Sequence, residues 1–277
     1  MSRENNQQQS IRAKLKKLAN DRAISFELAQ TEFLLERAVF RLCTDQNLSR
    51  HLVFKGGYVG VRCYESNRST VDIDALIHGM PKKEVLEKAK SSIENNINDG
   101  TWFQFEKEIN LLTQGEYGGT RLRFRGGIGD KPVNISKHQI IDLDLGIGDA
   151  VTPITINLDA MIFDEQISWK VYPVESMCSE KLHALADKGE FNSRSKDIYD
   201  LYQYLSKCDP KALKDSLVAT FSARETSLPP SFAKFFEAID KSVLKRGWQS
   251  LIRPLREKID FEVCANFIFE WLSENKI

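Results

Sequence analysis

The stretch Arg68-Ser-Thr-Val-Asp-Ile-Asp74 decides how the rest of the sequence is interpreted. Its apolar and acidic residues alternate, as side chains do along a β-strand whose two faces differ. Asp72 and Asp74 are therefore expected on one face and Val71 and Ile73 on the other. Two carboxylates on one strand face repel each other unless a cation lies between them, and hard divalent cations such as Mg²⁺ bind carboxylate oxygen. The stretch predicts a strand with a metal-binding pair of acids.

Glycines upstream of this stretch support a phosphate-binding function. The apolar run Leu52-Val-Phe54 is expected to be a short strand, and Lys55-Gly56-Gly57 follows it directly. Glycines at the exit of a strand let backbone N–H groups approach a phosphate closely. Together with the two acids, this pattern is typical of enzymes that hold a metal–triphosphate. A strand with one solvated face would explain the acids alone, so the glycines add weight to the functional interpretation.

A third carboxylate is expected from a strand predicted at residues 139–145. Its apolar residues alternate with Asp142 and Asp144, which again share one face. Transfer of a phosphoryl or nucleotidyl group is often served by two metal ions about 3.5–4 Å apart, and such a site needs a third acid. We predict Asp144 for this place, with Asp142 as the competitor and Asp149 in the following loop as a weaker candidate.

Composition is that of an ordinary globular protein. The 277 residues suffice for a full core, 42% of them are apolar, and Lys+Arg and Asp+Glu balance at 39 each. Net charge alone therefore predicts no polyanionic partner. Residues 1–22 hold six basic residues against two acidic ones, and residues 241–258 hold six against one. Such segments are either solvated helix faces or phosphate-contacting surfaces.

Cysteine usage and hydropathy favour a cytoplasmic protein. The five cysteines are scattered and form no C-x-x-C pair, which predicts reduced thiols rather than disulfides or a zinc site. The N-terminus is polar and lacks the apolar core of a signal peptide. No apolar stretch approaches the length of a membrane span.

The expected elements are those of an α+β protein. Residues 1–24 are predicted to be a basic helical arm, with disorder over 1–9. Residues 25–172 are predicted to form a mixed sheet flanked by helices, and residues 173–277 an all-helical domain, because the composition changes after Pro173. The strands are expected at 51–54, 70–77, 102–112, 120–125, 139–145 and 169–171, and the helices at 11–20, 26–43, 58–64, 82–98, 174–188, 195–206, 210–221, 230–244, 248–257 and 260–275.

The helical half holds a second set of charged residues. Asp197 and Asp200 are three residues apart in a predicted helix and therefore share a face. Ser195 is a suitable N-cap, and the helix dipole favours an acid near it, so Asp197 also has a purely structural explanation. Lys181, on the preceding helix, would ordinarily face solvent. Facing a triphosphate, it would bring a compact positive charge to the phosphate oxygens.

Together these residues resemble the AbiEii/AbiGii toxin family, a branch of the DNA polymerase β-like nucleotidyltransferases. The resemblance covers about residues 50–205. It rests on the following runs: Lys55-Gly56-Gly57, Arg68-x-Thr70-x-Asp72-x-Asp74, Ile141-x-Leu143-Asp144-x-Gly146-x-Gly148-Asp149-Ala150-Val151-Thr152-Pro153, Tyr172-Pro173-Val174-Glu175, Glu180-Lys181-Leu182-x-Ala184-Leu185 and Ser193-Arg194-x-Lys196-Asp197-x-Tyr199-Asp200-Leu201.

The resemblance implies a nucleotidyltransferase fold with a helical C-terminal domain, and use of an NTP with Mg²⁺ or Mn²⁺. It also implies a toxin that a cognate antitoxin neutralises in a bacterial type IV, abortive infection system. Some relatives modify the 3′ end of tRNA, so tRNA is an expected partner. By motif, the catalytic and metal-binding acids would be Asp72, Asp74 and Asp144, and the second essential pair Lys181 and Asp197. The nucleotide-binding residues would be Lys55, Gly56, Gly57, Arg68, Thr70, Lys181 and Lys196.

One position departs from the family pattern, since Tyr58 stands where many polymerase β-like enzymes have a phosphate-binding serine. Backbone N–H groups and Thr70 would then do that work. Two alternative functions are a transferase that modifies a protein or a small molecule, and an inactive module that binds nucleotide or antitoxin. Clustered carboxylates are costly without a metal, which argues against the inactive module.

Overall fold

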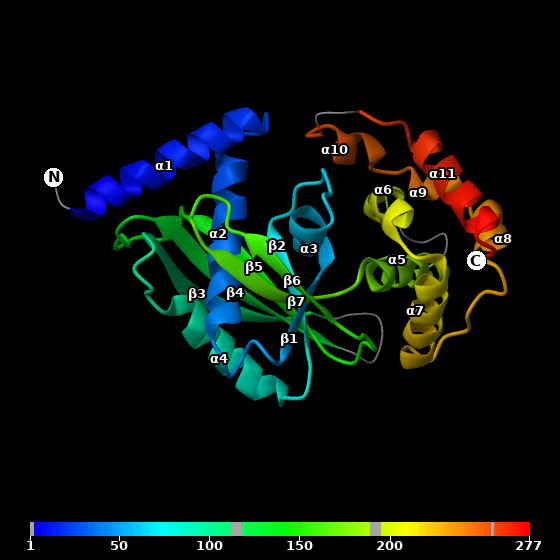
Figure 1. The fold of residues 1–277 in the computed structure, drawn as a ribbon, viewed down its shortest axis with the longest axis horizontal. Coiled ribbons are helices and arrows are strands. Elements are labelled where there is room, and N and C mark those ends of the chain that lie inside the picture. Colours follow the sequence, from blue (N-terminus) through cyan, green and yellow to red (C-terminus); the bar gives the residue numbers. More distant parts are fainter. Residues whose placement is uncertain (1–2, 112–117, 189–194, 256–257) are drawn as a thin grey trace. The chain divides into compact units, whose positions relative to one another are not determined.

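The computed structural model describes residues 3–111, 118–188, 195–255 and 258–277. The chain divides into two units, the first with a mixed β-sheet and helices and the second with helices (Figure 1). This arrangement confirms the predicted α+β class. The first unit comprises Met1–Cys63, Ser69–Gly148 and Ile154–Val171, and the second comprises Tyr64–Arg68, Asp149–Pro153 and Tyr172–Ile277.

Seven strands of the first unit form one sheet. They are β1 (Leu52–Lys55), β2 (Asp72–Ile77), β3 (Thr101–Leu111), β4 (Gly119–Ile128), β5 (Gln139–Gly146), β6 (Ile154–Asp159) and β7 (Gln166–Val171). Their order is β3-β4-β5-β2-β1-β7-β6. β2 lies at the centre, where it is parallel to β5 and antiparallel to β1. The predicted acidic strand is therefore supported on both sides.

Alternation along the central strands separates an apolar face from a charged face. Ile73 of β2, Leu122 of β4 and Leu143 of β5 are almost fully buried. The helices α2 (Phe26–Thr44) and α4 (Lys82–Glu94) pack against the sheet and against each other, so they cover the apolar face. Burial of apolar surface stabilises this layer by roughly 25 cal/mol per Å². The opposite face keeps the charged side chains of the same strands.

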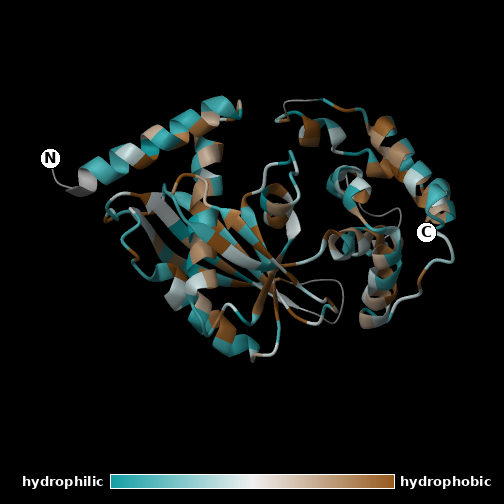
Figure 2. Cartoon of the chain, in the orientation of Figure 1, coloured by the Kyte–Doolittle hydropathy of each residue, from teal (hydrophilic) through white to brown (hydrophobic). Residues whose placement is uncertain are grey.

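The N-terminal helix is longer than the sequence indicates. α1 (Arg3–Asp21) includes residues 3–9, for which the prediction of disorder is wrong; residues 1 and 2 lie outside the described part of the chain. The side-chain amides of Gln7 and Gln8 each donate to a backbone carbonyl of the first unit at 3.2 Å, which holds this end of the helix. α1 is largely hydrophilic (Figure 2), but one face packs on α2. The buried residues of that face are Ile11, Leu15 and Ala19.

The sequence prediction misses β6, because it places no strand between residues 146 and 169. β6 lies at the edge of the sheet and pairs with β7. Ile154, Ile156 and Leu158 alternate with polar residues, which is the signal that was overlooked. Most of its side chains are partly or fully exposed, as expected for an edge strand.

The helices of the second unit follow the predicted order with two differences. They are α5 (Val174–Lys188), α6 (Ser195–Tyr204), the 3₁₀ turn η2 (Leu205–Lys207), α7 (Pro210–Ala223), α8 (Phe232–Ala238), α9 (Lys241–Leu244), α10 (Trp248–Ile252) and α11 (Phe261–Glu274). The helix predicted over 230–244 is two helices, because Asp240 is extended and its carboxylate caps α9. α10 ends just before Pro254, which cannot continue it. None of the described helices combines the length and the apolar character needed to cross a membrane.

Candidate functional site

Four aspartates of β2 and β5 lie on the charged face of the sheet. The two strands are parallel neighbours in a register that places Asp72 beside Asp142 and Asp74 beside Asp144. Residues directly beside each other in neighbouring strands point to the same face. The register therefore brings Asp144 next to Asp74, on the face that the sequence predicts.

Asp74 lies against the glycine turn between β1 and the helix α3 (Gly56–Cys63). Gly56 has φ +73°, and a Cβ atom placed on it would lie 2.0 Å from Oδ2 of Asp74. The backbone angle would strain any other residue here, and its Cβ atom would displace the Asp74 carboxylate. The carboxylate consequently lies at the start of α3, where backbone dipoles favour negative charge. Lys55 is paired with Asp74 in the register of β1 and β2, so it lies at the same level.

Thr70 and Tyr58 are both fixed by the first unit. The Thr70 hydroxyl donates to Oδ1 of Asp72 at 2.8 Å, so the threonine orients that carboxylate. Tyr58 is buried, its hydroxyl donates to the carbonyl of Glu32 at 3.1 Å, and its ring stacks on Trp169. The phenol that replaces the usual serine therefore points into the core, and it does not cover the backbone N–H groups of the glycine turn.

Two arginines of β4 share the charged face with these acids. Arg121 donates through Nε and Nη2 to both oxygens of Asp144 at 2.6 and 2.7 Å. Arg123 binds both oxygens of Asp142 in the same way at 2.8 Å. Nη1 of Arg121 is also 3.2 Å from Asp142, and its Nη2 is 3.9 Å from Asp72. The sequence predicts strand β4 from its alternating arginines but assigns them no role.

Arg121 carries a permanent positive charge beside the β2 acids. Its hydrogen bonds to Asp144 raise its pKa above the ordinary value, against the effect of partial burial, and the charges of Asp142 and Asp72 add to the rise. Its side chain is 26% exposed, so a ligand from solvent can reach it.

The acids fit a divalent cation unequally. Asp72 and Asp74 bring carboxylate oxygens, the ligands that Mg²⁺ prefers, next to backbone N–H groups that suit phosphate. Each oxygen of Asp144 already accepts a hydrogen bond from Arg121, and the positive charge of Arg121 would repel a cation placed at this carboxylate. Among the described residues, no group of three or more His, Cys, Asp or Glu side chains is arranged to hold a metal ion. The first unit thus offers two acids, Asp72 and Asp74, for a cation. The third acid predicted from the sequence, Asp144, is paired with Arg121 instead.

Lys181, in the second unit, is partly buried between two carboxylates. It lies on α5, and its Nζ is 2.6 Å from Asp200 and 3.2 Å from Asp197, both on α6. Burial alone would lower the pKa of Lys181, but the charges of Asp200 and Asp197 raise it above the ordinary value. Lys181 is thus a charged partner inside the helical unit and not a solvent-facing lysine. The motif residues Ser193 and Arg194 lie outside the described part of the chain.

Asp200 joins Lys181 to a second cation. Arg68 donates through Nε and Nη2 to the two oxygens of Asp200 at 3.1 and 3.4 Å. The sequence places Asp200 on the same helix face as Asp197 but gives it no role in the site. Lys196, a predicted nucleotide contact, is exposed on another side of α6 from the buried Asp197.

Asp149, the weaker candidate for a third metal ligand, takes part in a separate network of the second unit. Its oxygens accept hydrogen bonds from the Tyr172 hydroxyl at 3.1 Å and from Arg224 at 3.0 Å. Arg224 also binds Glu180 at 3.1 Å and approaches Nδ1 of His183 at 3.2 Å. The network ties the segment around residue 149 to α5 and α7.

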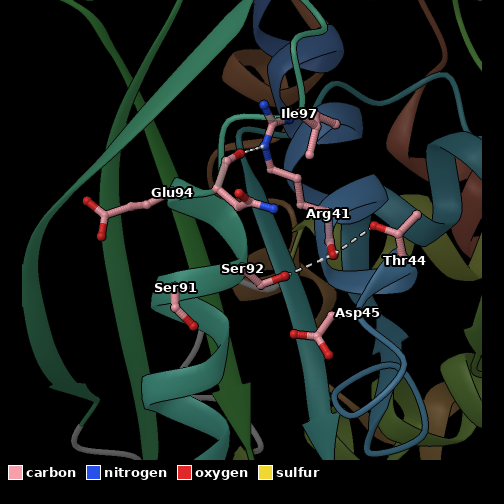
Figure 3. Close-up of a pocket in the computed structure, with 8 residues that line it drawn as sticks. Arg41, Thr44, Asp45, Ser91, Ser92, Glu94 and Ile97 are labelled. Carbon is pink, nitrogen blue, oxygen red and sulfur yellow. Dashed lines mark hydrogen bonds between the residues drawn. The ribbon is translucent and has the colours of Figure 1, made fainter.

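A cavity between α2 and α4 is not part of either acidic cluster (Figure 3). The hydroxyls of Ser92 and Thr44 donate to the backbone carbonyl of Arg41, and the Arg41 guanidinium is bound by Asp99. None of the predicted site residues lines this cavity. Its lining consists of Arg41, Thr44, Asp45, Ser91, Ser92, Glu94, Asn95 and Ile97.

The family model described as "Nucleotidyl transferase AbiEii toxin, Type IV TA system" matches residues 37–265. The matched range includes the acids, glycines and arginines of the sheet and the Lys181 cluster. The chain belongs to the AbiEii toxin family. It is a nucleotidyltransferase toxin, as the sequence motifs predict. A comparison with curated proteins found no match.

Solved structures share the fold of this AbiEii-family chain at low sequence identity. MenT4, a nucleotidyltransferase toxin of Mycobacterium tuberculosis, aligns with a TM-score of 0.61 at 18% identity, over 95% of this chain and 89% of that chain. JHP933 of Helicobacter pylori aligns with a TM-score of 0.55 at 17% identity, over 91% and 93% of the two chains. These similarities confirm the predicted nucleotidyltransferase fold.

Proposed function

We propose that this AbiEii-family enzyme uses Mg²⁺ or Mn²⁺ to transfer a nucleotide from an NTP to RNA, and that its acceptor is the 3′ end of tRNA. Modified tRNA would no longer support translation, which accounts for a toxin that a cognate antitoxin must neutralise. A cytoplasmic location, where NTPs and tRNA are found, belongs to the same proposal.

The proposal is carried by one observation in the first unit, the contact between the acidic strand and the glycine turn. Asp74 lies so close to Gly56 that a side chain at residue 56 would displace its carboxylate. In the proposal, Asp72 and Asp74 hold the cation, while Lys55 and the backbone N–H groups of Gly57 and the start of α3 receive the phosphates. A bound Mg²⁺ would supply charge neutralisation on the transferred phosphate. The residues of the chain would position the cation and orient the phosphates.

Lys181 and Asp197 are proposed as the second essential pair, as the family resemblance implies. Removing an ammonium group and carboxylates from water costs several kcal/mol per ion, so such a pair is weak evidence for stability alone. Lys181 has a raised pKa, and groups with strongly shifted pKa values are more frequent at functional sites. Arg68 and Lys196 are proposed as further nucleotide contacts.

The choice of tRNA rests on the family and not on the basic N-terminal segment. α1 packs on α2, which covers the apolar face of the sheet, whereas the acids lie on the opposite face. The basic residues of α1 therefore do not flank the acids of the first unit. In the other basic segment, Lys245 pairs with Glu262 and Lys258 donates to nearby backbone carbonyls. Arg256 and Glu257 lie outside the described residues.

Transfer to RNA can be measured directly. The purified protein is incubated with each of the four labelled NTPs, Mg²⁺ and total tRNA, and labelled RNA is quantified. We expect labelled RNA that EDTA abolishes and that Asp72→Asn lowers by at least about 100-fold, the order of loss when one electrostatic contact to a transition state is removed. Asp130→Asn, which alters an exposed acid of the same unit, is the matched control and should remain fully active.

Two results would refute this proposal. Label on protein instead of RNA would favour the protein-modifying transferase. The absence of transfer with every NTP, from protein that unfolds cooperatively, would exclude NTP-dependent transfer to tRNA.

A further inference from the structure

We propose that Arg121 contacts the phosphates of the bound nucleotide, and that Asp144 is a positioning residue that holds Arg121 and not a metal ligand. This inference rests on the proposed function. It adds to the site a residue from a third strand, β4, and it changes the role that the sequence predicts for Asp144.

The guanidinium group of Arg121 is only partly used by the protein. It has five N–H groups. Nε and one N–H of Nη2 donate to Asp144, and Nη1 lies 3.2 Å from an oxygen of Asp142. With one N–H of Nη1 counted for Asp142, two of the five remain among the described residues, one on each terminal nitrogen. Guanidinium N–H groups bind phosphate oxygens strongly, because both partners are charged.

The position of Arg121 brings these remaining donors beside β2. Its Nη2 lies 3.9 Å from Oδ2 of Asp72, which is too long for a hydrogen bond but leaves the two groups side by side. Asp74 follows on the same face of β2 and lies on the glycine turn. A phosphate bound over Asp72, on the side of β2 that faces β5, would therefore lie beside Arg121, which is also accessible to solvent.

Asp144 is suited to hold Arg121 in this position. The two residues are directly opposite each other in the antiparallel register of β4 and β5, so the sheet itself sets their distance. Two charge-assisted hydrogen bonds of 2.6 and 2.7 Å are at the strong end for such pairs. A cation at Asp144 would have to share both oxygens with Arg121 and lie beside its positive charge, which opposes binding.

Arg125 offers a matched control for Arg121. It lies on the same strand and the same face, four residues further along, and makes a comparable two-point contact. Its Nε and Nη2 donate to Glu106 of β3 at 3.1 Å, which turns it toward the strand on the other side of β4. Arg125→Gln therefore removes the same kind of ion pair from the same sheet without touching the β2 acids.

The first experiment measures NTP affinity without catalysis. Wild type, Arg121→Gln and Arg125→Gln are titrated calorimetrically with each of the four NTPs in EDTA, and in Mg²⁺ if EDTA abolishes binding. We expect Arg121→Gln to lose at least about tenfold in affinity, the value of one charged hydrogen bond. Arg125→Gln should stay within about threefold of wild type, with a similar unfolding temperature for both variants.

The outcomes separate this inference from the proposed function. If wild type and Arg121→Gln bind NTP with equal affinity, the inference is overturned and the proposed function is not. An equal loss in Arg125→Gln would also overturn it, because the effect would then be a general weakening of the sheet. Wild type that binds no NTP under either condition would overturn the proposed function together with the inference.

The second experiment isolates Asp144 with a double-mutant cycle on Mg²⁺-dependent transfer. If Asp144 acts through Arg121, Asp144→Asn should resemble Arg121→Gln, and adding it to Arg121→Gln should lower transfer further by less than about threefold. A metal ligand would instead cause an additional loss of about 100-fold in the double variant, as expected for Asp72→Asn. That additional loss would overturn the positioning role.

Discussion

Replacing Gly56 with alanine should reduce activity far more than it reduces stability. At φ +73°, an L-residue costs about 1–2 kcal/mol. The new Cβ atom would lie 2.0 Å from Oδ2 and 2.7 Å from Cγ of Asp74. Non-bonded atoms rest at about 3.5 Å or more, so the carboxylate must move by more than about 1 Å. A displacement of this size at a reacting group lowers the rate by roughly 100-fold.

Gly79→Ala is the matched control for this substitution. Gly79 has φ +68°, but the nearest atom to its added Cβ, Nδ1 of His51, lies 3.6 Å away. Both variants should lose about 1–2 kcal/mol in urea unfolding, since both place an L-residue at positive φ. Transfer of label to tRNA should fall in Gly56→Ala only. Equal transfer by the two variants, at equal folded fraction, would refute the view that Asp74 needs its place on the glycine turn.

Lys181→Met should lower the free energy of unfolding by about 3 kcal/mol, because it leaves two carboxylates buried without their ammonium partner. Lys211→Met, at an exposed position of α7, should change the free energy of unfolding by less than about 0.5 kcal/mol. An equally small loss in Lys181→Met would show that Lys181 does not stabilise the fold through the two carboxylates. The carboxylates raise the pKa of Lys181 in the folded state above its pKa of about 10.4 in the unfolded state. The contribution of Lys181 to stability is therefore complete below about pH 10.4, and it is lost only as the pH rises through the folded-state pKa. The stability difference between wild type and Lys181→Met should therefore be constant from about pH 6 to 9 in urea titrations, and a steady decline over that range would contradict the assignment. Lys181→Met should also weaken NTP binding, and unchanged affinity in calorimetry would remove Lys181 from the nucleotide site. Burial, and then the charge of Arg224, lowers the pKa of His183, so below about pH 6.5 the unfolded state binds a proton that the folded state does not. Stability should fall on acidification from pH 7.5 to 5, and less in His183→Gln than in wild type; equal falls would show that another group is responsible.

Local pattern is sufficient for part of the site. Alternation places Asp72 and Asp74 on one face of a strand whatever its neighbours are, and it does the same for Asp142 and Asp144. Which strands become neighbours is decided by packing over the whole sheet. The pairing of β4 with β5 was therefore not predictable from alternation, and neither was the position of Arg121 opposite Asp144.

Tertiary contacts also explain where the helices differ from prediction. A polar, glutamine-rich N-terminus has no apolar periodicity to indicate a packed helix, but hydrogen bonds from Gln7 and Gln8 to distant carbonyls hold it as part of α1. A lone lysine on a helix ordinarily faces water. Lys181 is partly buried because α6 packs beside α5 and presents two acids to it, which depends on the arrangement of helices and not on local sequence.

The parallel pairing of β2 with β5 has a consequence for how errors in folding affect this toxin. Asp142 and Asp144 alternate with Leu143 and Leu145, so a slip of β5 by one residue would turn the leucines to water and the acids toward α2. Each leucine exposed in this way would lose about 1.5–3 kcal/mol of burial. The ladder that assembles the acids is thus the same ladder that closes the hydrophobic layer, and a chain cannot settle into a slipped form that is stable but harmless.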